Sequence, residues 1–260
     1  MNLKLAGKVA VVTGGGQGIG RAIALALAKE QVKVVIADMN REAAQAVCKE
    51  IEALNQVAGY FAVDVTDKES VNEMVQSVLD KYNKIDILVN SAGLITISDV
   101  IDLREEDWDK VMSVNAKGVF LTCQAVLEHM IKNQNGKIIN IASQAGKTGF
   151  PHEAHYSASK GAVIVFTQAL AREVAKHKIN VNAVCPGSIE TEMNITVTEG
   201  TAKILGVSTD EKIQMTINST PLSRKGTPDD IAPMVVFLAS HYTDFMTGQA
   251  INITGGRELH

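Results

Sequence analysis

The sequence predicts an α/β fold: one domain built on a doubly wound parallel sheet, with helices on both faces. Short runs of β-branched and apolar residues recur along the chain, and each is followed by a longer amphipathic stretch. These runs are apolar without alternation, which is typical of strands buried on both faces of a parallel sheet. Strands that alternate with helices indicate the doubly wound architecture, and 260 residues are an ordinary length for one such domain.

The elements are predicted in chain order from these patterns. The apolar runs predict seven strands, at residues 8–14, 32–38, 58–65, 85–93, 136–143, 179–187 and 249–256. Helical spacing of apolar residues predicts helices at 20–31, 67–82, 104–133 and 160–177. Residues 188–221 show neither pattern, so we expect an irregular insertion there that covers one end of the sheet and contacts the substrate. Nothing resembles a linker, and the domain is expected to span 1–260.

Composition excludes several classes of protein. With 46% hydrophobic and 21% charged residues and a net charge of -4, the chain resembles neither a disordered segment nor a polycation for nucleic acid. We therefore expect a small-molecule substrate. No apolar run approaches the ~18 residues of a membrane span, and the first residues lack the features of a signal peptide. The three cysteines, Cys48, Cys123 and Cys185, are far apart and lack metal-ligand spacing, which favours reduced thiols in a cytoplasmic protein without a metal site.

The stretch TGGGQGIG ends the first predicted strand and opens the first helix. Its glycines, Gly14, Gly18 and Gly20, permit a tight turn and let the backbone approach a pyrophosphate, while the helix N-terminus offers free N–H groups to the anion. Gln17 and Ile19 lie in the same loop. A glycine-rich loop can also be a plain structural turn, but its place between strand and helix predicts a dinucleotide-binding Rossmann fold.

Asp38 ends the second predicted strand, 18 positions after Gly20, close to the ~20 expected for the residue that holds the adenosine ribose. Its carboxylate would accept from the 2′- and 3′-hydroxyls and repel a 2′-phosphate, so the sequence favours NAD. The alternative is a solvated residue at a strand end. Arg41 is a counterargument, because a guanidinium can pair with a 2′-phosphate, but the neutral Gln17 offers no second cation.

Tyr156 precedes Lys160 by four residues in a predicted helix, so the two side chains share a face. Free tyrosine ionises at about 10, and a neighbouring ammonium favours the phenolate. We predict that Tyr156 is the general base in oxidation and the acid in reduction, although such a pair also occurs by chance. Ser143, at the end of the fifth strand, would donate a hydrogen bond to the substrate oxygen. A helix cap is the simpler role for such a serine.

In the order and spacing of its motifs, the chain resembles the classical branch of the short-chain dehydrogenase/reductase family over essentially all of its length. Two positions depart from the family pattern: Ser91 stands where a second asparagine is usual, and Thr254 where an acid is usual before the last Gly-Gly. We expect Ser91 to keep the backbone role and Thr254 to affect packing near the C-terminus. The matching positions are Gly14, Gly18, Gly20, Asp64, Val65, Asn90, Gly93, Asn115, Ser143, Tyr156, Lys160, Pro186, Gly187 and Thr191.

The resemblance implies further roles. Lys160 would bind the nicotinamide ribose, and Asn115 would hold a water that relays the proton from Lys160 to solvent. Asp64 would meet the adenine, and Thr191 the carboxamide. It also implies a homotetramer, with helices at 104–132 and 157–177 in one interface. The remaining cofactor residues that it implies are Ile19, Val65, Asn90, Gly93, Pro186 and Gly187.

The leading hypothesis is an NAD-dependent oxidoreductase that interconverts a small polar secondary alcohol, a polyol or vicinal diol, and its ketone. Ser143, Gln144, His152 and Tyr156 are the predicted substrate contacts, and the closing residues resemble polyol and butanediol dehydrogenases of the family. One alternative is a 3-oxoacyl thioester reductase of the same family, which would usually prefer NADPH. Another is a regulatory protein that binds a dinucleotide without turnover. A metal at His152 and His155 lacks a third ligand of suitable spacing.

Overall fold

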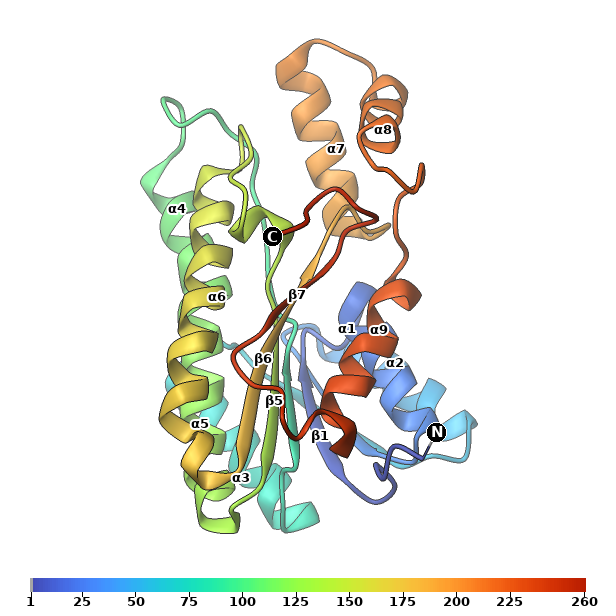
Figure 1. The fold of residues 1–260 in the computed structure, drawn as a ribbon, viewed down its shortest axis with the longest axis vertical. Coiled ribbons are helices and arrows are strands. Elements are labelled where there is room, and N and C mark those ends of the chain that lie inside the picture. The colour runs from blue at the N-terminus through green and yellow to red at the C-terminus, as the bar shows by residue number, and fades with distance from the viewer. Residues whose placement is uncertain (1) are drawn as a thin grey trace.

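A single parallel sheet carries the molecule in the computed structural model, which describes residues 2–260 (Figure 1). Within those residues the sheet has seven strands, ordered β3-β2-β1-β4-β5-β6-β7. Each lies inside a run that the sequence predicts, so the predicted fold class is confirmed. The strands are β1 (Val9–Thr13), β2 (Lys33–Asp38), β3 (Ala58–Ala62), β4 (Ile87–Asn90), β5 (Gly136–Ile141), β6 (Ile179–Pro186) and β7 (Ala250–Ile253).

The first strand lies at the centre of this order. Val11 of β1 pairs with Val35 of β2 on one side and with Leu88 of β4 on the other. The chain moves outward in one direction from β1 to β3 and in the opposite direction from β4, so the strand order reverses between β1 and β4. At such a switch point the connections diverge and leave a crevice at the carboxyl ends of the strands. The fold therefore places any ligand site there.

Helices cover both faces of the sheet (Figure 1). Successive β1 side chains point to opposite faces: Val12 belongs to the core under α1, α2 and α9, and Val11 to the core under α3, α5 and α6. These buried layers exclude water from both faces and hold the strand ends in place. The helices are α1 (Gly18–Lys29), α2 (Arg41–Ala53), α3 (Lys68–Tyr82), α5 (Gly118–Asn133), α6 (Ala154–Val174) and α9 (Pro228–Ala239).

The helix predicted at 104–133 has an interruption. It consists of α4 (Glu105–Met112), one π turn (Ser113–Lys117) and α5. Asn115 lies within the π turn and is fully buried. Single π turns are frequent at functional sites, and periodicity alone does not reveal one, because the apolar spacing continues across it.

The expectation of irregular structure at 188–221 was wrong, because most of this segment is helical. It forms α7 (Glu192–Leu205) and α8 (Thr209–Asn218), which stand above the sheet in Figure 1. The sequence carries the cause in its capping residues. Thr191 caps α7, Gly206 ends it with a φ of 68°, and Ser208 and Glu211 form a capping box on α8.

Three sequence expectations concern membrane-spanning helices, the state of the cysteines and metal sites. Across residues 2–260, no helix combines the length and apolar character that a bilayer crossing requires. Cys48, Cys123 and Cys185 are free and buried. In the same part of the chain, no three His, Cys, Asp or Glu side chains gather closely enough to hold a metal ion.

Candidate active site

A cleft of about 620 Å³ opens at the carboxyl ends of the strands, between the sheet and the α7–α8 pair. It runs from the glycine loop after β1 to the start of α6 and the C-terminal tail. Most of the site residues that the sequence predicts therefore lie on its wall. The predicted residues that line it are Gly14, Gln17, Gly18, Ile19, Gly20, Asp38, Val65, Gly93, Ser143, Gln144, His152, Tyr156, Lys160, Pro186, Gly187 and Thr191.

The glycine loop leaves room for a phosphate group. Gly14 has a φ of 60°, and a Cβ there would lie 2.7 Å from the Ala92 Cα. A Cβ at Gly20 would overlap the Gly14 carbonyl oxygen. Gln17, the N-cap residue of α1, makes no side-chain capping bond, so the first N–H groups of this helix remain available to an anion. Glycines thus let the loop pack closely against its own backbone and Ala92, and the uncapped helix start beside it fits the pyrophosphate of a dinucleotide.

Asp38 is held at the edge of the cleft by the backbone. Its Oδ2 accepts from the Gly16 N–H and its Oδ1 from the Asn40 N–H, both at 2.9 Å. Each carboxylate oxygen retains a second lone pair for a ribose hydroxyl. Arg41, the counterargument from sequence, lies with its Cζ 5.8 Å from the centroid of the Tyr60 ring and does not line the cleft. The cleft wall at Asp38 is therefore acidic.

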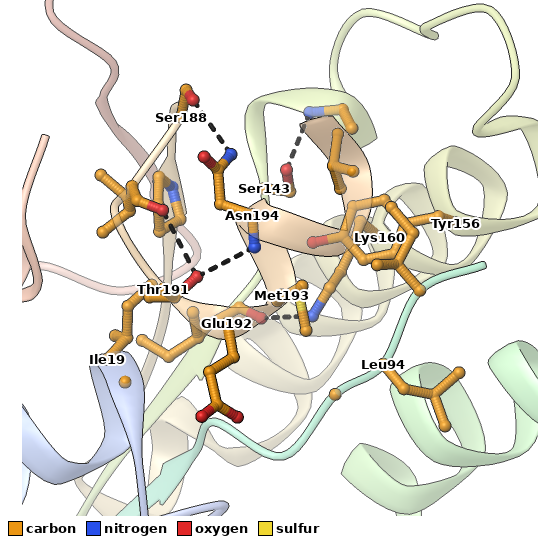
Figure 2. Close-up of a pocket in the computed structure, with 18 of the residues that line it drawn as sticks. Ile19, Leu94, Ser143, Tyr156, Lys160, Ser188, Thr191, Glu192, Met193 and Asn194 are labelled. Atoms are coloured by element: carbon orange, nitrogen blue, oxygen red, sulfur yellow. Dashed lines mark hydrogen bonds between the residues drawn. The ribbon is translucent and has the colours of Figure 1, made fainter. Parts of the chain in front are cut away.

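Ser143, Tyr156 and Lys160 meet on the opposite wall (Figure 2). Ser143 follows β5 and accepts from the Ala145 N–H at 3.1 Å, while Tyr156 and Lys160 lie on successive turns of α6. The Lys160 Nζ donates to the Ile141 carbonyl at 2.9 Å and lies 5.7 Å from the centroid of the Tyr156 ring. The end of β5 thus anchors both the serine and the lysine beside the phenol.

Burial dominates the acid–base properties of this wall. It raises the pKa of Tyr156 to about 12, against a smaller lowering by the Ser143 hydroxyl. It also lowers the pKa of Lys160 to about 8. In the site without a cofactor, desolvation of the phenolate therefore outweighs the groups around it. The ammonium form of Lys160 still predominates at pH 7.

Asp64 and Asn90 lie behind the wall of the cleft, not on it. The Asp64 carboxylate accepts from the Thr66 N–H and hydroxyl, both at 2.8 Å. Asn90 donates from Nδ2 to the Asn140 Oδ1 at 2.9 Å and accepts from the Thr122 hydroxyl at 2.7 Å. These bonds fasten the loop after β3 to itself, and β4 to β5 and α5. Both side chains therefore position the cleft and do not face it.

The Asn115 side chain is also engaged away from the cleft. Its Oδ1 accepts from the Leu94 N–H, and its Nδ2 donates to the Leu94 carbonyl, both at 2.9 Å. Nδ2 also donates to the Ser159 hydroxyl at 3.0 Å. The amide thereby joins the π turn to the loop after β4 and to α6, next to Lys160. A relay water has no unused side-chain donor here and would need the Asn115 backbone.

Thr191 closes the cleft between two helix starts. Its hydroxyl accepts from the Asn194 N–H at 3.3 Å as the N-cap of α7. A Cβ at Gly18 would lie 3.3 Å from the Thr191 methyl carbon, so the start of α1 and the start of α7 are in near contact. Figure 2 shows Thr191 and Asn194 across the cleft from Tyr156. Thr191 is therefore both a cap and a cleft residue.

The predicted substrate contacts have unequal environments. Gln144 is 7% exposed and its Oε1 has no hydrogen-bond partner among the described residues, so this acceptor is available to a ligand. His152 adopts a φ of 66°, and its Nδ1 lies 2.7 Å from the Asp99 Oδ1. Its ring is thus partly committed to the loop after β4. His155 is buried against Thr96 and lies outside the cleft.

The sequence predicted that residues 188–221 contact the substrate, but it did not single out two groups of side chains on the substrate side. One is apolar: Leu94, Ile95, Phe150, Met193, Val197 and Leu205 line the cleft. The other is cationic, and consists of Lys212 on α8 and Arg257 in the C-terminal tail. The capping box at Ser208 could have revealed α8, and with it the position of Lys212. No local pattern marks Arg257, because only the fold brings the tail to the cleft.

Comparison with known proteins agrees with this geometry. The short chain dehydrogenase family model matches residues 8–202. A 3-oxoacyl-[acyl-carrier-protein] reductase FabG of Thermotoga maritima is 40% identical over 255 residues, 98% of this chain and 99% of the relative. An NAD+-bound xylitol dehydrogenase superposes with a TM-score of 0.95 at 37% identity, over 97% of this chain and 100% of that one. A single-substitution variant of actinorhodin polyketide ketoreductase with NADPH superposes with a TM-score of 0.94 at 37% identity, over 97% of this chain and 98% of that one.

Proposed function

Because this chain belongs to the short-chain dehydrogenase family, we propose that it is an NAD-dependent oxidoreductase that interconverts a small polar secondary alcohol, a polyol or vicinal diol, and its ketone. Membership establishes an oxidoreductase fold for a nicotinamide dinucleotide. The choice of NAD and of the substrate class is our inference. The choice of NAD is carried by the Asp38 carboxylate, which the backbone holds at one end of the cleft. The polyol class is supported by the 37% identity with an NAD+-bound xylitol dehydrogenase.

The cofactor preference follows from charge at that end. A 2′-phosphate would meet the Asp38 carboxylate and the neutral Gln17. Arg41 is drawn toward Tyr60, and the Arg21 guanidinium pairs with Glu50, with 3.0 Å between Nε and Oε1. Neither arginine lines the cleft. A phosphate beside a carboxylate and without a countercharge is disfavoured by like-charge repulsion, so NAD is favoured over NADP.

The reaction divides between cofactor and protein. A bound nicotinamide supplies the acceptor or donor of the hydride. Because the Ser143 oxygen accepts from the Ala145 N–H, its hydroxyl hydrogen is free to orient the substrate oxygen. In oxidation, the Tyr156 phenolate would take the proton from the hydroxyl oxygen as the hydride leaves the carbon that bears this hydroxyl, which gives the ketone. In reduction, the phenol returns that proton to the oxygen.

The high pKa of Tyr156 bears on the direction of the reaction. In the free site the phenol form predominates at neutral pH, which suits the acid role in reduction. Oxidation needs added positive charge beside the phenol, and Lys160 together with an oxidised nicotinamide would provide it. We infer that Lys160 also binds the nicotinamide ribose, and that a proton leaves it through a water on the Asn115 backbone.

A second candidate is reduction of a 3-oxoacyl thioester. The 40% identical relative that bears that name favours it, and so do apolar cleft residues such as Leu94, Phe150 and Met193. The acidic ribose end argues against the usual NADPH preference. A regulatory protein without turnover is disfavoured, because Ser143, Tyr156 and Lys160 are all present on one wall.

We also infer a homotetramer in the cytoplasm. Phe120 on α5 and Val165 on α6 are 42% and 64% exposed, and Phe120 meets Phe166 edge to face, with 6.4 Å between ring centroids. Apolar residues on neighbouring helices favour a subunit contact there. The buried free cysteines favour a reducing compartment. Light scattering at several protein concentrations measures the number of subunits.

The proposed function is tested with a substrate panel. Xylitol, sorbitol, butane-2,3-diol and an acetoacetyl thioester are assayed with both nicotinamide cofactors at one pH. We expect turnover of a polyol or diol, with kcat/KM at least about tenfold higher for NAD than for NADP. Thioester reduction with NADPH and no activity on any polyol or diol would establish the second candidate instead.

A further inference from the structure

Two basic side chains that the dehydrogenase chemistry does not use line the substrate end of the cleft. They are Lys212, in the second turn of α8, and Arg257, in the C-terminal tail. Both are partly buried. The Arg257 Cζ lies 5.2 Å from the centroid of the Phe150 ring, which belongs to the same wall. Figure 1 shows the tail returning to this end of the molecule between α6 and α7.

These cations have no fixed countercharge. Within residues 2–260, neither Lys212 nor Arg257 has a carboxylate within 4.0 Å, and neither side chain donates a hydrogen bond. By contrast, Arg224 on the outer surface is paired with Asp230. Burial, and then Arg257, lower the pKa of Lys212. The two positive charges therefore repel each other in a partly desolvated space. An anion bound between them would offset this repulsion.

Glu153 is the one acid near them that lines this part of the cleft, and it does not neutralise both. Burial raises the pKa of its carboxyl, while Lys212, Arg257 and His152 oppose that shift. Lys225 adds a further positive charge near Lys212. α6 also begins here, at Ala154, without a side-chain cap, so its positive end faces the same region. Besides burial, Arg257 and Lys225 lower the pKa of Lys212 and Glu153 opposes them, so positive groups outnumber the acid around Lys212.

The backbone holds these two segments together. The Leu222 N–H donates to the Gly255 carbonyl at 3.1 Å, which joins the end of the α8 segment to the tail. A Cβ at Gly255, where φ is 66°, would lie 2.7 Å from the Thr220 methyl carbon. The Thr254 hydroxyl accepts from the Glu258 N–H and donates to the Glu258 carbonyl, both at 3.1 Å. Arg257 lies between these anchors, so it is a built part of the wall.

We propose that Lys212 and Arg257 form an anion-binding subsite, and that the substrate carries a phosphate or carboxylate group that these two cations hold while Tyr156 acts on a hydroxyl or carbonyl carbon nearby. This inference rests on the proposed dehydrogenase function. Glu153 precedes Tyr156 by only three residues, so the subsite begins beside the reacting group. A guanidinium and an ammonium on one wall are well suited to either oxyanion, since both form charge-assisted hydrogen bonds.

Matched pairs of substrates test the subsite. D-sorbitol is compared with D-sorbitol 6-phosphate, and butane-2,3-diol with 3-hydroxybutanoate, all with NAD. We expect one anionic member to exceed its neutral partner in kcat/KM by at least about tenfold. Which pair separates tells whether the group is a phosphate or a carboxylate. In Lys212→Met and in Arg257→Met, kcat/KM for the anionic substrate should fall at least about tenfold through a higher KM. For the neutral partner, kcat/KM should stay within about threefold of wild type.

Lys203→Met is the matched control, because it removes the same charge from the exposed face of α7, outside the cleft. It should leave both members of each pair unchanged. Calorimetric titration of inorganic phosphate and of acetate into the enzyme–NADH complex gives a second readout, with the pyrophosphate cradle already filled. We expect binding of one of them to be lost in the Lys212→Met/Arg257→Met double variant and kept in Lys203→Met.

The outcomes separate the two proposals. If neutral polyols turn over as well as their anionic partners and neither anion depends on the two cations for binding, the subsite is overturned and the dehydrogenase proposal stands. If no alcohol turns over but anion binding still requires Lys212 and Arg257, the subsite stands and the dehydrogenase proposal fails. If Lys203→Met lowers the preference for the anionic substrate as much as Lys212→Met and Arg257→Met do, the preference is a general effect of protein charge. That result also overturns the subsite.

Discussion

The two ends of the cleft are built in different ways. At the cofactor end, backbone atoms form the surface: the glycine loop, the uncapped start of α1, and a carboxylate held by the Gly16 and Asn40 N–H groups. At the substrate end, side chains from widely separated segments form it, among them Phe150, Lys212 and Arg257. A backbone surface requires short local motifs, whereas a surface of side chains requires the whole fold.

This difference explains how one scaffold can keep its cofactor while its substrate varies. Replacement of a glycine in the loop would place atoms where backbone already lies. Replacement of Lys212 or Arg257 would change charge without disturbing the sheet. We therefore expect substitutions at the cofactor end to affect folding and cofactor binding together, and substitutions at the substrate end to affect selectivity alone.

Tyr156→Phe should give the largest effect, because Tyr156 carries the proton in the proposed chemistry. The substitution removes only the ionisable hydroxyl. We expect kcat to fall by about 10²- to 10⁴-fold, as is typical for loss of a general acid–base, with NADH affinity unchanged. Tyr242→Phe makes the same chemical change on the exposed surface and should have no effect. A variant that keeps more than about a tenth of wild-type kcat rules out Tyr156 as the proton carrier.

Gly20→Ala tests the cofactor end. The new Cβ would overlap the Gly14 carbonyl oxygen, so the loop has to shift. We expect the free energy of unfolding to fall by about 2 to 3 kcal/mol, together with weaker NADH binding. Urea unfolding and a fluorescence titration measure the two effects. Gly149→Ala, where a Cβ would meet nothing within 4 Å, is the control and should change stability by less than about 0.5 kcal/mol. Equal effects for both variants would contradict the idea of a backbone-built surface.

Asp38→Ser tests the charge of the same end without the steric change. The hydroxyl can still accept one backbone hydrogen bond, but it no longer repels a 2′-phosphate. We expect the ratio of kcat/KM for NAD to that for NADP to fall by at least about tenfold, or about 1.4 kcal/mol. Asp67→Ser removes a carboxylate from the N-cap of α3, outside the cleft, and serine can replace it as a cap. A ratio that stays constant in Asp38→Ser would place cofactor selection elsewhere.

The sequence was most informative where the chemistry is local. The glycine loop, Asp38 and the Tyr156–Lys160 pair each depend on spacing within one or two elements, and all of them line the cleft. Lys212 and Arg257 are 45 positions apart, and neither is marked by periodicity or by a turn. Their proximity depends on the contact between Leu222 and Gly255, which only a folded chain provides.

The direction of side chains was a second feature that the sequence could not predict. The sequence placed Asp64 and Asn90 correctly at the ends of strands, but local partners turn their polar groups away from the cleft: Thr66 for Asp64 and Asn140 for Asn90. Burial was the third. The sequence predicted that Lys160 and an oxidised nicotinamide favour the phenolate, but it did not reveal that desolvation raises the pKa of Tyr156 in the free site. Neither effect follows from spacing, because each depends on what surrounds the group in three dimensions.

The smallest expected effect is the pH dependence of stability in Lys160→Met, which tests whether burial governs the wall between the two ends. The pKa of Lys160 is about 8 in the folded protein, below its value of 10.5 in an exposed lysine. Between these values the unfolded chain binds more protons than the folded one, so the contribution of Lys160 to the free energy of unfolding rises with pH.

The free energy of unfolding of the wild type minus that of Lys160→Met should therefore be constant below about pH 7.5 and increase by about 1 kcal/mol between about pH 8 and 9. Burial raises the pKa of Cys185 to about 11 and that of Tyr156 to about 12, which lowers the stability of both proteins at high pH. Lys160 lowers the pKa of Cys185 by a smaller effect than burial raises it, so most of this contribution cancels in the difference. Urea unfolding of the two proteins at a series of pH values gives this difference directly. A difference that does not change with pH would mean that Lys160 keeps an ordinary pKa and that water reaches it, and the wall would then be as open as the substrate end.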